Sequence, residues 1–325
     1  NNQLEVNMQD VEIINETAIW RSREVKYVSG NWTQISRNIP LFELGNFSEG
    51  TGEIVNKYYK TVIRLPLTQL ENRIPVGIVS NTYTLAQHYE VAKLCIDGLR
   101  NCNIGINDVH CELGLSTLSE WMNFRIYFPE KYDFTSTDSN PLKLRLECFN
   151  SVDGSSQLTI LFGWFRLICS NGMVIGKTVS ELRDIHNKNM DLSKISSIIS
   201  EAMFQVQSDK KMMSRWGNTQ INSDSLANWV DTTVSKKWGK KAAFKVFHVC
   251  LTGHDSKYAD PFESERPSRK SMIKLAKVPG SPNKAKNLYD IAQALSWIAT
   301  SRKNAEERTK WQTEVPKLLD FLRPE

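Results

Sequence analysis

The stretch from Gln157 to Met190 constrains the fold more than any other part of the chain. It opens with a long apolar segment, Leu158 to Cys169, and then reaches the dipeptide Asn171-Gly172. Asn and Gly tolerate the positive φ angles of a two-residue type I′ turn, so this dipeptide predicts a hairpin turn after a strand. An amphipathic pattern typical of a long helix begins near Asp191. The stretch therefore predicts a boundary between a β-rich first half and an α-rich second half.

Two segments of the first half, 122–128 and 142–149, alternate between apolar and polar residues. The polar positions include Arg125, Tyr127, Lys143, Arg145 and Glu147. A period of two predicts strands with one face in the core and the other in water. Further strands are expected at 58–65, 74–80, 109–115 and 158–169. Because sequential strands with short connections usually pair, we expect an antiparallel β-meander.

Helical spacing of apolar residues predicts helices at 83–100, 191–213 and 287–301. We expect the first two to cover one face of the sheet. Another helix should run through Val234, be interrupted at Lys236–Lys241, and resume until Gly253. The segment 255–283 contains four prolines and many basic residues, which favours a flexible loop.

These elements predict an α+β protein, in which the meander packs against long amphipathic helices and a helical, basic C-terminal portion follows. We expect a peripheral N-terminal arm at 1–54, an α+β core domain at 55–215, and a helical basic C-terminal region at 216–325 with a flexible loop at 255–283. A chain of 325 residues is long enough for one large domain or two smaller ones.

Positive charge is concentrated in the second half of the chain. From Glu201 onward there are 22 Lys and Arg against 14 Asp and Glu, whereas the first 200 residues hold 19 against 22. Cations bind phosphates by releasing counterions, and aromatic rings stack on unpaired bases. The predicted nucleic-acid contacts are Arg166, Lys177, Arg183, His186, Lys188, Lys210, Lys211, Arg215, Trp216, Lys236, Lys237, Trp238, Lys240 and Lys241. The alternative is a solvated helical surface in which Trp216 and Trp238 anchor the core.

Other kinds of site have weaker support. The five histidines, His88, His110, His186, His248 and His254, lack zinc-ligand spacing, and we expect no metal and no cofactor. Catalysis by a Cys169–His186 pair would require the two side chains to converge, and Cys169 also fits a buried strand end. The glycines Gly172 and Gly176 are too close together for a phosphate-binding loop. No catalytic motif is present, so we expect a protein that is not an enzyme.

The six cysteines are sparse for this length and indicate reduced thiols in a cytoplasmic protein. The sequence contains no run of 18 apolar residues, the length that a membrane-spanning helix needs, so we expect no membrane partner.

Four phrases resemble the phage- and plasmid-related family catalogued as domain of unknown function 932. They are IPVGIVSNTY at 74–83, GWFRLICSNG at 163–172, RDIH at 183–186 and NLYD at 287–290. The resemblance implies a mobile genetic element as context. The expected order of elements also looks like the core of single-strand-annealing recombinases, which implies a homo-oligomer that binds single-stranded DNA in recombination. Fold-level similarity does not fix function.

Two functions are therefore expected. The first is a nucleic-acid-binding protein of a mobile element, with single-stranded DNA favoured as the partner and annealing as the activity. The alternative is a protein–protein module that acts on host defence or replication machinery, with a host or phage protein as partner. Binding of a labelled oligonucleotide distinguishes them.

Overall fold

The computed structural model describes residues 11–50, 54–135, 141–166, 171–173, 179–184, 191–258, 270 and 272–322, with the backbone alone at 165–166, 171–173 and 179–184. The chain divides into two compact units. Unit 1 comprises Asn1–Pro129, Arg145–Phe162 and Lys177–Phe204, and unit 2 comprises Glu130–Leu144, Gly163–Gly176 and Gln205–Glu325. This division differs from the predicted consecutive domains, because the chain passes between the units inside secondary-structure elements.

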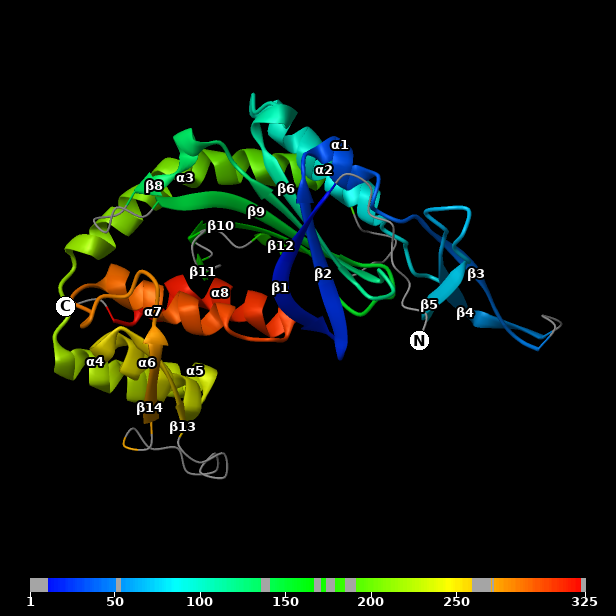
Figure 1. Ribbon diagram of the computed structural model, residues 1–325. Coiled ribbons are helices and arrows are strands. Elements are labelled where there is room, and N and C mark those ends of the chain that lie inside the picture. The colour runs from blue at the N-terminus through cyan, green and yellow to red at the C-terminus, as the bar shows by residue number, and fades with distance from the viewer. Residues whose placement is uncertain are drawn as a thin grey trace. The chain divides into compact units, whose positions relative to one another are not determined.

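A nine-stranded sheet contains most of the strands (Figure 1). Its order is β1 (Glu12–Trp20), β2 (Arg23–Gly30), β6 (His110–Ser116), β7 (Trp121–Tyr127), β9 (Pro141–Ser151), β10 (Leu158–Arg166) and β11 (Asn171–Met173). In addition, β12 (Val179–Asp184) pairs with β10, and β8 (Phe134–Thr135) pairs with β9. The pairs from β2 to β9 are antiparallel, as predicted for an α+β fold.

In unit 1, the apolar side chains of β7 and β9 meet helices. Phe124 packs on Trp32 of α1 (Trp32–Ser36), with 5.7 Å between the ring centroids. The predicted helix 83–100 is α2 (His88–Asn101), and the predicted helix 191–213 is α3 (Lys194–Asn218). A Cβ on Gly98 would lie 2.6 Å from Cδ1 of Ile199, so glycine lets these two helices approach closely.

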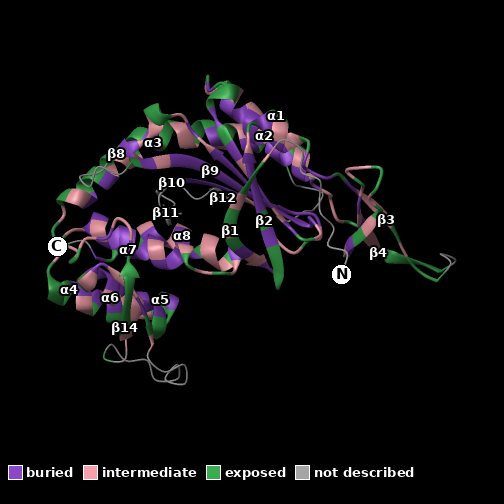
Figure 2. Ribbon diagram, in the orientation of Figure 1, coloured by how far each residue is buried: buried purple, intermediate pink, exposed green. Residues whose placement is uncertain are grey.

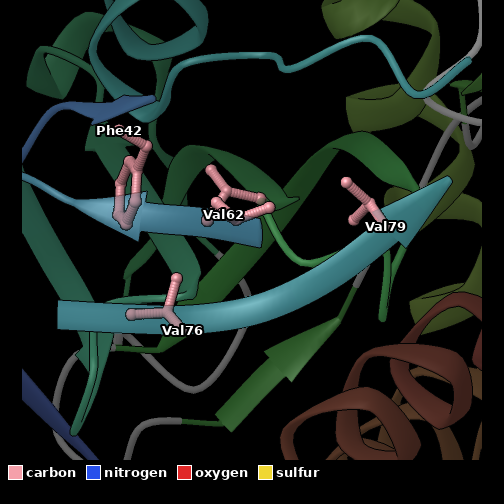
Figure 3. Close-up of a cluster of buried hydrophobic side chains, with 5 residues drawn as sticks. Phe42, Val62, Val76 and Val79 are labelled. Atoms are coloured by element: carbon pink, nitrogen blue, oxygen red, sulfur yellow. The ribbon is translucent and has the colours of Figure 1, made fainter. Parts of the chain in front are cut away.

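A separate three-stranded sheet is formed by β3 (Phe42–Glu49), β4 (Ile54–Arg64) and β5 (Ile74–Ser80). One of its faces buries Phe42, Val62, Val76 and Val79 together with Val152 (Figure 3). The strands predicted at 58–65 and 74–80 are therefore present, but they belong to this separate sheet and not to the nine-stranded one. The place beside β6 is taken by β2, which pairs with it from Val25 to Gly30.

The N-terminal segment is more than the predicted peripheral arm. Its strands β1 and β2 belong to the large sheet, and Tyr27 and Val28 are buried. Arg21 and Ser22, with φ angles of 45° and 65°, form the two-residue turn between these strands. Positive φ at both positions is the type I′ signature, here carried by residues that rarely adopt it.

The turn predicted at Asn171-Gly172 is wrong. Phe165 pairs with Gly172 and Arg166 with Asn171, so both residues of the dipeptide lie in β11. The connection between β10 and β11 is residues 167–170, which lie outside the described residues.

The C-terminal part of unit 2 is helical. It contains α4 (Ser223–Trp229), a π-helical turn (Val230–Val234), α5 (Ser235–Trp238), α6 (Lys240–Thr252), α7 (Leu288–Thr300) and α8 (Ala305–Asp320). Most residues of α7 are buried (Figure 2). The predicted flexible loop 255–283 is partly a hairpin, because β13 (His254–Tyr258) pairs with β14 (Met272–Lys277).

The short helical turns Ile106–Asp108 and Glu130–Tyr132 complete the described elements. Among the helices in the described ranges, none is both long enough and apolar enough to cross a membrane.

Candidate nucleic-acid interface

Four of the predicted contacts gather at one corner between two helices of unit 2. Lys236 and Lys237 end α5, and Lys240 and Lys241 begin α6. The chain turns between them at Gly239, whose φ of 83° is readily available only to glycine. All four lysines are exposed. We call this set of four residues the lysine corner.

The lysine corner carries uncompensated positive charge. Within the part of the chain that the structure describes, none of its ammonium groups has a carboxylate within 4.0 Å. Lys245, one turn further along α6, is instead paired with Asp255 at 3.4 Å. The corner is therefore a compact cationic surface that attracts anions.

The beginning of α6 adds to this potential. Gly239 precedes the helix and provides no capping side chain, and the first backbone hydrogen bond runs from Ala243 N–H to the Gly239 carbonyl at 3.0 Å. The N–H groups of the first turn therefore lack helical partners, and the helix dipole is positive at this end. Lysine side chains and free N–H groups at one helix end together favour an anionic ligand.

Trp238, which lies within the lysine corner, is buried. Its indole is 7% exposed and stacks on Trp311, with centroids 4.5 Å apart and planes within 7°. Its Nε1 donates a hydrogen bond of 2.7 Å to Glu314. Trp216 is 4% exposed. Because neither ring has a free face for an unpaired base, both residues drop out of the predicted interface, and the alternative of core anchors holds.

The three predicted cations of α3 differ from one another. Lys210 lies over the ring of Trp164, 5.7 Å from its centroid, and burial lowers its pKa while nearby Asp133 opposes this. Lys210 is thus an internal contact and not a free phosphate ligand. Lys211 and Arg215 are exposed, four residues apart on one helix face, and have no carboxylate partner in the described ranges.

The remaining predicted contacts lie at positions where the structure describes the backbone alone or lie outside the described residues. Arg166 ends β10 and Arg183 lies in β12, where the backbone alone is described. Lys177, His186 and Lys188 lie outside the described residues, and so does Cys169 of the Cys169–His186 pair.

Sequence reasoning missed a buried ionic network in the unit 1 part of the large sheet. Arg125 donates hydrogen bonds to both carboxylate oxygens of Glu16, at 2.6 and 2.9 Å. It also donates to Glu112 at 3.1 Å and to Glu147 at 3.0 Å. Arg125 is 4% exposed and Glu147 is 3% exposed, so the network is removed from water.

A second arginine extends the network along β9. Arg145 donates to Glu147 at 2.8 Å and to the Tyr127 hydroxyl at 2.9 Å. The Tyr127 hydroxyl donates to Glu112 at 3.1 Å. Burial alone would raise the pKa of Glu147, but Arg145 and Arg125 outweigh it and lower that pKa. The carboxylate is therefore held charged by its partners.

This network corrects the expectation that the polar face of 122–128 and 142–149 lies in water. The register places Glu112, Arg125 and Glu147 side by side on β6, β7 and β9. Tyr27 lies flat under the Arg125 guanidinium at 4.3 Å from its ring centroid. The signal that could have revealed this is the cross-strand pairing of opposite charges in adjacent predicted strands. Since its charges satisfy one another, the network is structural.

Metal binding has no support in the described residues, where no three His, Cys, Asp or Glu side chains are grouped to hold an ion. The lysine corner and, separately, Lys211 and Arg215 of α3 remain as the exposed cations suited to an anionic partner.

Comparison with known proteins adds one finding. The family model described as Domain of unknown function (DUF932) matches residues 75–313, which is most of the chain. No curated protein and no solved structure matches the chain. The matched range includes the lysine corner, α3 and the strands β6, β7 and β9 of the ionic network, whereas Glu16 on β1 lies outside it. The chain therefore belongs to the family defined by the domain of unknown function 932.

Proposed function

We propose that this protein binds nucleic acid without chemical catalysis, with single-stranded DNA as the favoured ligand and the lysine corner as the principal contact. The observation that carries the proposal is that four exposed lysines share one turn and none has a carboxylate partner in the described residues. Clustered like charges repel one another, so such a cluster is best explained by an anionic partner that neutralises it.

The proposed chemistry is contact with backbone phosphates. Each phosphate of a single strand that the protein neutralises contributes about −0.7 to the slope of log affinity against log salt. Contacts from Lys236, Lys237, Lys240 and Lys241 would therefore give a slope of about −3. Lys211 and Arg215 of α3 are candidates for additional phosphate contacts. Binding of this kind depends strongly on salt and weakly on base sequence.

The first experiment measures the anisotropy of a labelled single-stranded oligonucleotide, beside a duplex of the same sequence, at low and moderate salt. Preference for the single strand with a steep salt dependence supports the proposal. Absence of binding at low salt overturns it and favours the alternative, a protein–protein module. In that case capture of a partner from lysate should be insensitive to nuclease.

The contribution of the corner is tested by reversing Lys236, Lys237, Lys240 and Lys241 to Glu. We expect binding to be abolished, because four attractive contacts become repulsive. A matched control reverses four other exposed lysines of unit 2, Lys284, Lys303, Lys310 and Lys317, which changes the net charge equally. Loss of binding in the first variant and its retention in the control locates the site. Unchanged binding in the corner variant removes the corner from the interface.

The proposal extends to annealing by an oligomer, as the expected similarity to single-strand-annealing recombinases implies. Two complementary strands labelled as a fluorescence-transfer pair should anneal faster with the protein than without it. Light scattering of the free and DNA-bound protein measures the oligomer. A monomer that binds single strands without accelerating annealing would limit the function to binding.

A further inference from the structure

The hairpin of β3 and β4 in unit 1 extends beyond the third strand of its sheet (Figure 1). β5 pairs with β4 from Tyr59 to Arg64 only, whereas β3 continues to pair with β4 as far as Ile54. Residues 54–58 therefore form part of a two-stranded ribbon. Every residue from 54 to 59 is exposed (Figure 2).

Two adjacent tyrosines lie at the base of this ribbon. Tyr58 is 62% exposed and Tyr59 is 49% exposed, in contrast to the buried Tyr27 of the large sheet. Successive strand residues point to opposite faces, so the two rings lie on opposite faces of the ribbon. Further along the same strand, Val62 points inward and belongs to the buried cluster of this sheet.

The backbone of the two tyrosines is fixed. Asn81 donates its backbone N–H to the Tyr58 carbonyl and its side-chain amide to the Lys57 carbonyl, both at 2.9 Å. The Lys57 ammonium lies 5.0 Å from the centroid of the Tyr58 ring. The rings are thus presented to solvent from an ordered backbone.

The charge directly beside the two tyrosines is positive. Glu43 and Glu71, at the other end of this sheet, are paired with Arg73 and Arg64 respectively, and the exposed Glu49 lies across from Ile54, four residues from Tyr58. Lys57 and Lys60, which flank the tyrosines, have no carboxylate within 4.0 Å in the ranges that the structure describes. An anionic ligand with flat aromatic groups is complementary to this surface.

We propose that the segment Lys57–Lys60, here named the tyrosine ribbon, binds unpaired nucleic-acid bases by stacking on Tyr58 and Tyr59, with Lys57 and Lys60 on the adjacent phosphates. This inference rests on the proposed nucleic-acid function and assigns to it a base-dependent contact. The lysine corner recognises phosphates alone, whereas the tyrosine ribbon distinguishes a strand with accessible bases from a duplex.

The test replaces both tyrosines with alanine in the full chain and compares oligothymidylate with an abasic oligonucleotide of equal length. The unsubstituted protein should prefer oligothymidylate, because only that ligand has bases to stack. Tyr58→Ala/Tyr59→Ala should lose about tenfold in affinity per ring for oligothymidylate, with unchanged affinity for the abasic ligand and an unchanged salt slope. The matched variant Tyr58→Phe/Tyr59→Phe keeps both rings and should keep the preference.

If the double alanine variant loses affinity equally for both oligonucleotides, or loses none for either, the inference is overturned. A double alanine variant that sediments as a smaller species with unaltered base preference also overturns it, because the ribbon would then contact a second copy. The lysine-corner variant separates the two proposals, since it should abolish binding of both ligands, with and without bases. If the lysine-corner variant binds normally while the alanine variant does not, the result supports the tyrosine ribbon as a binding site and excludes the corner.

Discussion

The ionic network of unit 1 and the lysine corner of unit 2 use charged side chains in opposite ways. On the sheet, Arg125 is buried and satisfied by three carboxylates. At the corner, four lysines are exposed and the described residues supply no carboxylate to any of them. The number of charged residues is therefore a poor guide to function, whereas the fraction of their charge left uncompensated is informative.

The difference follows from solvation. A buried ion must be paired, since desolvation penalises its charged form, and its partner then leaves it no capacity for a ligand. An exposed lysine keeps its hydration and can exchange it for a phosphate with release of counterions. The following predictions test whether the two regions separate structure from binding in this way.

The largest expected effect is from Arg125→Ala. It would leave the carboxylates of Glu16, Glu112 and Glu147 close together and without their shared cation. Removing one partner of a buried ionic network costs about 3–5 kcal/mol in the free energy of unfolding. Urea unfolding followed by tryptophan fluorescence measures this loss.

A matched control is Lys93→Ala, which breaks the exposed ion pair between Lys93 and Asp97 on α2. Exposed pairs contribute about 0–1 kcal/mol, so this variant should unfold almost as the unsubstituted protein does. Equal effects of the two substitutions would mean that the network is solvated and that the comparison fails.

A smaller effect is expected from Gly114→Ala on β6. The added Cβ would lie 2.4 Å from Cε1 of Tyr27, whose ring supports Arg125. Overpacking of this kind costs about 1–3 kcal/mol. In contrast, Gly217 of α3 has no atom within 4 Å of its added Cβ, so Gly217→Ala should not destabilise the protein. Unfolding midpoints of both variants measure the difference, and similar midpoints would exclude a close contact at Tyr27.

Much of the architecture could be predicted from periodicity. The strands near 122–128 and 142–149 and the helices near 191–213 and 287–301 are present, because a core-facing stripe repeats in each. Turns were harder. The Asn171-Gly172 dipeptide lies in a strand, while Arg21 and Ser22 make the tight turn against their intrinsic preference. Tertiary pairing of β2 with β6 overrides that local signal.

The candidate site was predicted in part. The lysine corner is recognisable because six consecutive residues, 236–241, contain four lysines around a glycine. The burial of Trp216 and Trp238 and the contact of Lys210 with Trp164 could not be predicted, since they depend on residues distant in the sequence such as Trp311 and Trp164. The buried network was missed because alternation of polar and apolar residues does not say whether the polar face meets water or its own counterions.

Asp209 of α3 sharpens the comparison, because it is partly buried without a paired cation in the described part of the chain. Burial raises its pKa from 3.8 to about 6. A raised acid pKa means that the folded state binds the proton first, so stability rises as the pH falls through about 6 toward 3.8. Asp209→Asn should remove this dependence and raise the melting temperature at pH 7 more than at pH 5.

Glu147→Gln provides the opposite case, because its partners lower the pKa of Glu147 in the folded protein. Its contribution to stability is present above the ordinary glutamate pKa of about 4.3 and is lost as the pH falls through the lower folded pKa. Melting curves from pH 3 to pH 7 should therefore show the stability of Asp209→Asn, relative to the unsubstituted protein, rising toward neutral pH, and that of Glu147→Gln falling as the pH rises from 3. A constant difference for Asp209→Asn would show that its carboxylate is solvated or paired.

The smallest effect on stability, and the one that opposes function, is expected at the beginning of α6. Lys240 and Lys241 place positive charge at the positive end of the helix dipole, which is unfavourable by about 0.3–1 kcal/mol each at low salt. Lys240→Gln/Lys241→Gln should therefore raise the melting temperature slightly while weakening oligonucleotide binding. Lys310→Gln/Lys317→Gln on α8 is the control with equal charge removed. A gain in stability with a loss of binding, confined to the α6 variant, would mean that the corner retains unfavourable charge for its ligand. A loss of both would assign those lysines to the fold, as in the network of the sheet.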